Sequence, residues 1–514
     1  MGNAATKPRG APLMSRTRSV VLVSLLTPVG LVLGLASNWL IVRVFGLSPE
    51  LDAYFVAYLF PSFAGGVIAE FLGRNFIPTL DRLVINRSKR DTTEYISAVI
   101  SFSIIASLGL TVIFWIVIQS LIKIVAPGLT FEYITLAVSM ANIMLTGVVF
   151  MTINVFHEYI HQVQHRFFRP QLAQLAVPVV TLGSVLIFGH SVGAIVLAWA
   201  FLAGQVIIFI ALIPGLDYKF KPTLRFRNPE VWNTIISSGW LMLSGTLSYA
   251  RGFIERYLAS LLGSGAVSAI ALAARFSAPL QQGAGLGMKL VAFRRASELV
   301  AAGKNSEAGH LSLQVISIVI MLLVQVSIWL AVDADLLIKV LFASRSLGTD
   351  GQTMLTETTR GFLLAVPIMA VAPILTNIYF VLNKSKYVVI ARPITLIGYI
   401  FCLYLLYKPL GVFGITLANL ATFFISFLII SWHISKLLDG FKLSDLWINL
   451  MRYFFIAILS SLVVEHFVRR WMLMDIMTLV IDGVISHIIY FVVLFVLRDK
   501  YFQTILEKLS QRKN

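Results

Sequence analysis

Apolar stretches long enough to cross a lipid bilayer follow one another along almost the whole chain. A membrane-spanning helix needs about 20 mainly apolar residues, and on that measure the sequence predicts about fourteen spans. Their predicted limits are 19–45, 52–73, 95–125, 131–156, 167–189, 191–214, 231–262, 265–291, 308–331, 353–382, 387–407, 411–435, 447–467 and 475–497. Because lipid cannot hydrogen-bond the backbone, such spans fold as helices. The sequence therefore predicts an all-α polytopic membrane protein.

The composition supports the same class. Of the 514 residues, 58% are hydrophobic and 13% are charged, whereas soluble domains are about 45–50% apolar and about 25% charged. The single cysteine, Cys402, excludes a disulfide framework and a cysteine metal site.

Lysine and arginine gather in alternate loops. The rich segments include 1–18, 74–90, 219–227, 384–392 and 498–513, and the bare ones include 46–51, 126–130 and 190–192. Positively charged loops stay on the cytoplasmic side of a membrane. We therefore expect a multi-pass protein of the bacterial inner membrane with both termini in the cytoplasm. The net charge of +17 is then a topology signal and does not indicate a nucleic-acid partner.

The two halves of the chain carry a similar pattern. Arg169 and Pro170 open the fifth predicted span as Arg392 and Pro393 open the eleventh, and a glycine begins the next span in each copy. Two six-helix bundles in a parallel pseudo-repeat, followed by an extra helix pair, explain this pattern. The predicted parts are a cytoplasmic N-terminus 1–18, a first bundle 19–214, a cytoplasmic linker 215–230, a second bundle 231–435, the pair 447–497 and a cytoplasmic tail 498–514. Repeats of this kind place a substrate site near the midplane between bundles.

Ionisable residues inside predicted spans are candidate functional residues because burying a charge in lipid is costly. Arg275 lies about ten residues into the eighth span, which places it near the middle of the bilayer. Its sequence neighbours include no acid, so its partner comes from another helix or from a ligand. An ion pair between helices and a contact with an anionic ligand both stay open.

Two further groups of charges lie within predicted spans. Arg251 and Glu255 are four residues apart and share a helix face, with Arg256 beside them, and Glu70 and Arg74 repeat that spacing. Mutual neutralisation would lower the cost of burying them, so a structural role stays open beside substrate binding.

Arg43 and Asp52 flank the first turn between spans. Arg43 can reach the lipid headgroups by extending its side chain, and Asp52 can cap the second span, so both have structural alternatives to binding. Because cations exceed anions among these residues, we expect an anionic substrate. Guanidinium groups match phosphate oxygens with paired hydrogen bonds.

The segment 157–161 reads His-Glu-Tyr-Ile-His, which matches the helical zinc-site pattern with a glutamate base. Asp439 followed by glycine would supply a third ligand, so His157 and His161 form a weak candidate metal site for an intramembrane metalloprotease. The pattern falls at the end of a span beside Arg166 and Arg169, and we interpret these histidines as interfacial residues. We predict no metal centre, no enzymatic activity and no cofactor.

Several short segments resemble one known family. They lie in the first hairpin, in the eighth span and before the tenth and twelfth spans, and comprise Leu33, Gly34, Phe45, Gly46, Asp52, Ala53, Tyr54, Ala57, Pro61, Ala69, Glu70, Phe76, Ile77, Pro78, 264–268, Ala274, Arg275, Leu341, Phe342 and 411–414. With these residues the chain is similar to the MurJ (MviN) lipid II flippase family of the multidrug/oligosaccharidyl-lipid/polysaccharide exporter superfamily.

The resemblance implies a function. The family moves undecaprenyl-pyrophosphate-linked saccharides from the cytoplasmic to the outer leaflet through a cationic cavity between two bundles, and its last two spans help form a groove for the lipid tail. Arg275 falls on a cavity arginine of the family and Asp52 on its aspartate after the first turn. The implied partners are the lipid-linked saccharide, membrane lipids and glycan-synthesis machinery, with Na⁺, H⁺ or the membrane potential as the driving force.

The chain departs from the family at several cavity positions. Family arginines are replaced by Leu31, Ser37, Gly65 and Gly66, and family acids by Ala274 and Ala278. A flippase for an exopolysaccharide or O-antigen-type precursor is therefore an alternative to one for lipid II. A drug–cation antiporter, which would need an acidic lumen, and a transport-dead scaffold are further alternatives.

Overall fold

The computed structural model describes residues 13–226, 228–283, 286–342, 346–382, 384, 386–469 and 474–511. The regular elements over these residues are the helices α1 to α18, which confirms the predicted all-α class. The chain divides into two compact units, Met1–Val267 and Ser268–Asn514, and the division falls in the first turn of α10.

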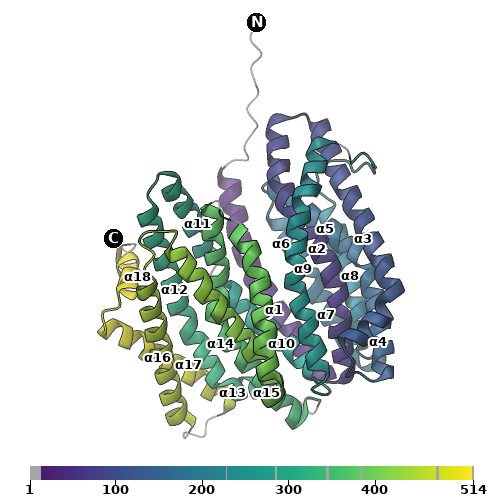
Figure 1. Ribbon diagram of the computed structural model, residues 1–514. Helices are drawn as coiled ribbons and strands as arrows, with labels where there is room; N and C mark the ends of the chain where they lie inside the picture. Colours follow the sequence, from purple (N-terminus) through teal and green to yellow (C-terminus); the bar gives the residue numbers. More distant parts are fainter. Residues whose placement is uncertain are drawn as a thin grey trace. The chain divides into compact units, whose positions relative to one another are not determined.

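The described residues of the first unit form nine complete helices that run largely side by side (Figure 1). They are α1 (Leu13–Phe45), α2 (Pro49–Asn86), α3 (Lys89–Val125), α4 (Phe131–Thr146), α5 (Val148–Val163), α6 (Phe168–Ala173), α7 (Ala176–Val192), α8 (Val196–Leu212) and α9 (Pro229–Ser260). Helix α9, which the sequence places in the second bundle, groups here with the first unit and packs against α2. The predicted division into two six-helix bundles stays a prediction.

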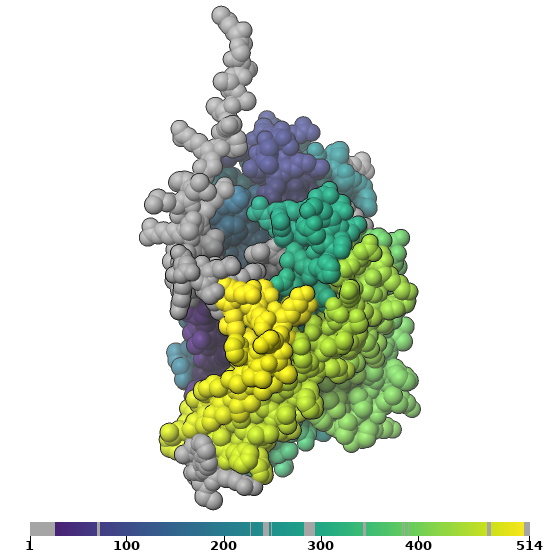
Figure 2. Space-filling view, turned by 90° about the vertical axis from the view of Figure 1, so that its left-hand side faces the viewer, coloured from purple at the N-terminus to yellow at the C-terminus, as the bar shows by residue number. Residues whose placement is uncertain are grey.

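The second unit contains the remaining helices, the last of which, yellow in Figure 2, lie at its surface. They are α10 (Ala266–Gly283), α11 (Leu286–Ala301), α12 (Asn305–Val332), α13 (Ala334–Phe342), α14 (Gly348–Val381), α15 (Lys386–Ser435), α16 (Leu443–Val468), α17 (Asp475–Val496) and α18 (Lys500–Gln511). Its core lies where α12, α14 and α16 pack together, around side chains such as Ile320, Val371 and Tyr453.

Ten stretches of described residues are long and apolar enough to cross a membrane, so the protein is a multi-pass membrane protein. Each predicted span overlaps a helix. The stretch Lys386–Ser435 combines two predicted spans, and Val196–Leu212 is a shorter apolar helix. The total of about fourteen spans stays a prediction.

The helix boundaries differ from the prediction in several places. The predicted span 131–156 is two helices that meet at Gly147, and 265–291 covers α10 and the start of α11. The short α13 and the amphipathic α18 were not predicted because neither reaches the length and hydropathy of a span. Gly193 and Gly411, both with positive φ, lie where the predicted spans 191–214 and 411–435 begin.

Helix α2 is longer than a membrane is thick. It begins after Ser48, whose hydroxyl accepts from Leu51 N at 3.3 Å, and Pro49 stands at its first position. Asp52 therefore does not cap this helix as considered above. The 38 residues of α2 extend about 57 Å, roughly twice the hydrocarbon thickness. We call the end where α2 finishes and α9 begins the basic end of the first unit.

Helices α16 and α18 of the second unit meet at a buried carboxylate. Asp499 is 1% exposed and accepts from the backbone N–H groups of Tyr501 at 3.0 Å and Phe502 at 2.9 Å, which caps α18. It also forms an ion pair with Arg452 of α16 and accepts from the Tyr453 hydroxyl at 3.2 Å. These bonds fix α18 to α16.

We expect Gly309→Ala to destabilise the protein by about 1–3 kcal/mol, because a new methyl group would overlap the backbone of Asp439 in the turn before α16. The measurement is thermal unfolding of the purified protein in detergent. Gly398→Ala is the matched control, since its new Cβ meets nothing within 4 Å. Equal melting temperatures for the two variants would contradict this packing.

Candidate functional site

The helices α2 and α9 form a tightly packed seam through the first unit. Four of its side chains interlock: Phe63 contacts the ring of Tyr249 with centroids 5.6 Å apart, and Phe253 contacts Phe60 at 5.6 Å and Phe63 at 5.9 Å. The interplanar angles of 60° to 89° are those of favourable edge-to-face pairs.

Two glycines allow the close packing of this seam. A Cβ at Gly66 would overlap the hydroxyl of Tyr249, and one at Gly65 would overlap the Met151 side chain of α5. Larger residues therefore do not fit at either position in this conformation. Tyr249 and Met151 therefore occupy the space beside the two positions where the resemblance led us to expect arginines.

A buried hydrogen bond closes the seam at the end opposite the basic end. Asp52 is 1% exposed, and its Oδ2 accepts from the backbone N–H of Gly265 at 2.6 Å. Gly265 has φ +86°, and a Cβ there would come within 2.8 Å of the Leu47 carbonyl oxygen. Asp52 thus ties the start of α2 to the turn that follows α9.

The charges predicted within α9 lie in the half of this helix nearer Asp52. Glu255 and Arg256 form an ion pair at 3.0 Å, with side chains only 11% and 17% exposed respectively. Arg251 is half-buried one turn earlier. This ion pair joins adjacent residues, and the pairing of Arg251 with Glu255 stays a prediction.

The other predicted site residues are spread over the two units. Arg43 is exposed at the end of α1, with its guanidinium carbon 5.0 Å from the centre of the Trp39 ring. Arg275 is half-buried in α10 of the second unit. The side chains of Glu70 and Arg74 lie outside the described part of the structure.

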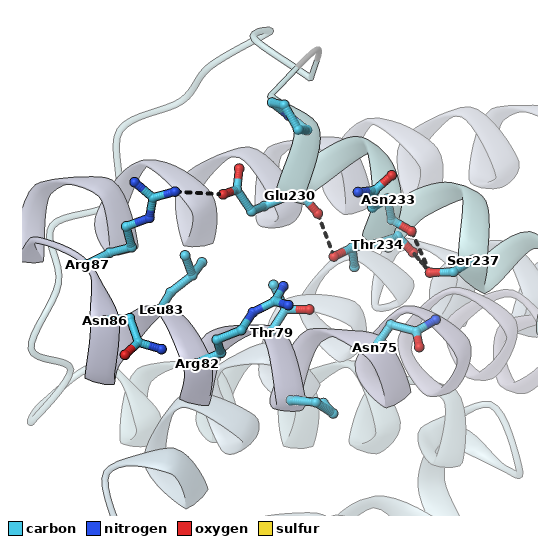
Figure 3. Close-up of a pocket in the computed structure, with 12 residues that line it drawn as sticks. Asn75, Thr79, Arg82, Leu83, Asn86, Arg87, Glu230, Asn233, Thr234 and Ser237 are labelled. Carbon is cyan, nitrogen blue, oxygen red and sulfur yellow. Dashed lines mark hydrogen bonds and ion pairs between the residues drawn. The ribbon is translucent and has the colours of Figure 1, made fainter. Parts of the chain in front are cut away.

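A polar pocket of about 500 Å³ lies at the basic end of the seam (Figure 3). Its floor includes the buried Leu83, and its walls come from the last turns of α2 and the first turns of α9. The lining residues are Asn75, Pro78, Thr79, Arg82, Leu83, Asn86, Arg87, Pro229, Glu230, Asn233, Thr234 and Ser237.

The pocket offers cationic and neutral hydrogen-bonding groups together. Arg87 Nη2 lies 3.7 Å from Glu230 Oε1, and the dashed line in Figure 3 marks this ion pair. Arg82 forms no ion pair with any residue that the structure describes, and its side chain is exposed. A guanidinium group, amides and hydroxyls are the groups that bind phosphates and sugars.

Sequence reasoning used Arg82 only as a topology charge and missed this pocket. Two observations could have indicated it: the length of α2 beyond any bilayer, and the polar residues Asn75, Thr79 and Asn86 along that extension. The position of α9 could not have been predicted, because it depends on tertiary packing. The bond from Asn75 Nδ2 to Ser238 Oγ, at 2.9 Å, fixes the two helices beside the pocket.

The histidine pattern of α5 is used in packing. His161 Nε2 lies 2.9 Å from the Leu212 carbonyl oxygen, and His157 Nε2 lies 3.2 Å from the Tyr218 hydroxyl. Glu158 accepts from Gln174 at 3.1 Å. Over the described residues, no three His, Cys, Asp or Glu side chains converge as metal ligands. The Nε2 atoms of both histidines have protein partners.

Comparison with known proteins identifies the family. The family model described as "Lipid II flippase MurJ" matches residues 41–482. The chain belongs to the MurJ family. It is a family of transporters rather than enzymes, so the metalloprotease alternative finds no support in it.

Individual MurJ relatives are distant in sequence. The lipid II flippase MurJ of Burkholderia cenocepacia is 27% identical over 51% of this chain and 53% of its own length. The probable lipid II flippase MurJ of Rickettsia prowazekii is 22% identical over 73% of this chain and 75% of its own length. The chain spans about half the length of the first curated relatives that it matches.

Solved structures agree on the fold. A lipid II flippase MurJ in an inward closed conformation matches with a TM-score of 0.76 and 18% identity, over 93% of this chain and 99% of the other. An inward-facing MATE family transporter of the MOP superfamily matches with a TM-score of 0.64 and 19% identity, over 85% and 98%. The chain therefore has the fold that MurJ shares with MATE transporters.

We expect Asp52→Ala to lower the stability of the first unit by about 1–3 kcal/mol, because the buried Gly265 N–H loses its acceptor. Asp52→Asn keeps an acceptor oxygen and should lose less. The measurement is thermal unfolding in detergent, with the exposed Asp81→Ala on the same helix as control. A melting temperature of Asp52→Ala equal to that of the control would show that this bond contributes nothing.

Proposed function

We propose that the protein is a flippase in a bacterial inner membrane, with both termini in the cytoplasm. It moves an undecaprenyl-pyrophosphate-linked saccharide from the inner to the outer leaflet by alternating access. The observation that carries this proposal is the match of the MurJ family model to residues 41–482. The fold similarity to a MurJ structure along 93% of the chain supports it.

The charges within apolar helices fit an anionic substrate. Arg275 lies in α10, and Arg251 and Arg256 lie in α9, where Arg256 is paired with Glu255. Arginine binds phosphate oxygens through two parallel hydrogen bonds. In the proposed cycle Arg275 binds the pyrophosphate, while the polyprenyl tail stays in lipid beside α16 and α17.

The polar pocket at the basic end of α2 and α9 suits the saccharide head before translocation. The positive-inside rule places this end in the cytoplasm, where the substrate would be presented. Arg82 supplies a cation, and the amides of Asn75, Asn86 and Asn233 supply paired donors and acceptors for hydroxyl groups. Contact at this pocket would precede movement towards Arg275.

The glycine pair of α2, Gly65 and Gly66, is relevant to the identity of the transported saccharide. Because Tyr249 and Met151 fill the space beside Gly66 and Gly65, this chain binds pyrophosphate without the family's cations at these positions. An exopolysaccharide or O-antigen-type precursor therefore remains the alternative substrate beside lipid II. Either substrate needs a driving force, and the membrane potential supplies about 2.3 kcal/mol per charge per 100 mV; Na⁺ or H⁺ are the candidate coupling ions.

The decisive test is complementation of bacteria depleted of their own lipid II flippase. We expect the wild-type chain to restore growth and Arg275→Ala to reduce it at least tenfold, because a charge that binds the pyrophosphate is lost. Arg294→Ala is the matched control, since Arg294 is exposed and pairs with Glu298 at 3.2 Å.

Equal rescue by wild type and Arg275→Ala would contradict the assignment of Arg275. No rescue by well-expressed wild type would contradict lipid II as the substrate. The same variants would then be examined in a strain that lacks its exopolysaccharide flippase.

We expect Arg82→Ala to weaken transport about threefold to tenfold, because a solvated cation contributes about 0.5–1.5 kcal/mol to phosphate binding. Arg90→Ala is its control, an exposed arginine paired with Glu94 at 3.2 Å. The measurement is the rate of lipid-linked saccharide appearance in the outer leaflet of proteoliposomes. A rate for Arg82→Ala equal to that of Arg90→Ala would exclude the pocket from transport.

A further inference from the structure

A buried carboxyl group in the last membrane-spanning helix has no hydrogen-bond partner. Asp482 of α17 is 1% exposed, and neither of its carboxylate oxygens is hydrogen-bonded to a described residue. An ionised carboxylate in such a place loses its hydration without compensation, which is among the largest costs in protein energetics. A membrane-spanning helix retains such a residue chiefly for function.

Other acids surround Asp482 at the same end of the second unit. Asp333, which follows α12, is also 1% exposed. Asp333 and Asp482 interact electrostatically, and both interact with Glu465 of α16. Asp335 lies in the first turn of α13. The four carboxyl groups come from four different elements.

The guanidinium group of Arg469 forms ion pairs with members of this cluster. Arg469 Nη2 lies 2.8 Å from Asp335 Oδ1 and 3.5 Å from Asp333 Oδ1, and its Nε lies 3.2 Å from Glu465 Oε1. The donors of Arg469 are directed at these three acids. The positive charge of Arg469 therefore acts on Asp482, but Asp482 receives no hydrogen bond from it. Among the residues that the structure describes, four carboxyl groups around one cation would carry an excess of three negative charges if all were ionised.

The remaining charged groups near α17 do not offset this excess. Lys339 Nζ of α13 forms an ion pair with Asp475 Oδ2 at 2.9 Å, near the surface. His487 Nδ1 lies 2.6 Å from the Gly483 carbonyl oxygen of its own helix, and its ring faces Trp329 of α12. His466 of α16 contacts the ring of Phe467. Helix α18 also packs on α17, but at the C-terminal end of α17, away from Asp482.

We propose that Asp482 and Asp333 form a proton-binding site that holds one proton between two buried carboxyl groups near neutral pH. Two like charges in one buried place cannot both be ionised cheaply, so one of them keeps its proton. Because both oxygens of Asp482 lack a hydrogen-bond partner among the described residues, they are available to share this proton with Asp333. A protonated carboxyl is also neutral, which removes the cost of burying it in α17.

The pKa of Asp333, just beyond the end of α12, agrees with this site. Burial raises it most, the negative charge of Asp482 also raises it, and Arg469 lowers it, so that it lies at about 7 instead of the ordinary 3.8. A raised pKa in the folded protein means that the native state binds the proton more tightly than the unfolded chain does. The contribution to stability is complete below the ordinary pKa and is lost as the pH rises through about 7.

Through this site the external pH can change the electrostatic repulsion that acts on α17, one of the last helix pair. The distribution of Lys and Arg places this end of the unit outside the cytoplasm. Proton release adds repulsion between the α12–α13 corner and α17, whereas proton binding removes it. Any link from this change to substrate movement rests on the proposed flippase function, but proton binding itself does not.

The direct test is infrared difference spectroscopy of the purified full chain in lipid nanodiscs, titrated from about pH 5 to about pH 9. We expect a carbonyl band of a protonated carboxyl group that disappears with a midpoint near pH 7. In Asp482→Asn the midpoint should move to lower pH by about one unit, because the neighbouring charge is gone. In Asp333→Asn the midpoint of the band should likewise differ from that of the wild type.

Asp475→Asn is the matched control, because Asp475 lies in the same helix but is paired at the surface. Its midpoint should equal that of the wild type. A wild-type protein without a titrating carboxyl band would overturn the proposal, and so would a band unchanged in both Asn variants. Titrations in sodium and in choline chloride separate the ions: a sodium-dependent midpoint would overturn a site for protons alone.

Thermal unfolding supplies a second readout that needs no transport. The melting temperature of the wild type should fall as the pH rises from about 5 to about 8, and this fall should be smaller in Asp333→Asn and Asp482→Asn. A fall of equal size in all three proteins would contradict the site. Because neither measurement involves substrate, failure of the complementation experiment would leave both results interpretable.

Discussion

The contact between α2 and α9 is the constraint on which the first unit depends. Glycine at position 66 allows Tyr249 to approach α2, and the aromatic rings above it interlock only at that distance. The same approach brings Asn75 within reach of Ser238 and places polar residues of both helices around one pocket. A residue with a side chain at Gly66 would alter the packing, the pocket and the position of the α9 charges together.

Each buried charge in this membrane protein has its own physical solution. Asp52 is hydrogen-bonded to a backbone N–H, Glu255 is paired with its neighbour Arg256, and Asp499 accepts from the first turn of α18. Asp482 lacks such a bond, and protonation is the solution that remains. Chemistry that changes with conditions is therefore expected at Asp482, whereas the bonded carboxylates serve mainly to join helices.

Much of the fold could be predicted from the sequence, because lipid admits few alternatives. The apolar runs located the helices, and the motifs around Asp52 and Arg275 indicated the MurJ family before any comparison. The candidate site was harder to predict. Arg82 looks like any loop arginine until α9 is placed beside it, and Asp482 is one acid in an apolar run until Asp333 is brought near. Those juxtapositions come from residues distant in the chain, which periodicity and local spacing cannot reveal.

The seam of α2 and α9 is fastened unequally along its length. At one end Asp52 joins the helices through a short, buried bond to Gly265. At the other end some of the contacts are exposed, and the ion pair of Arg87 with Glu230 spans 3.7 Å in contact with water. Separating the helices is therefore cheaper at the basic end, because water replaces the lost contacts there. Thermal fluctuations of this helix pair should pivot about Asp52, with the largest amplitude at the mouth of the polar pocket.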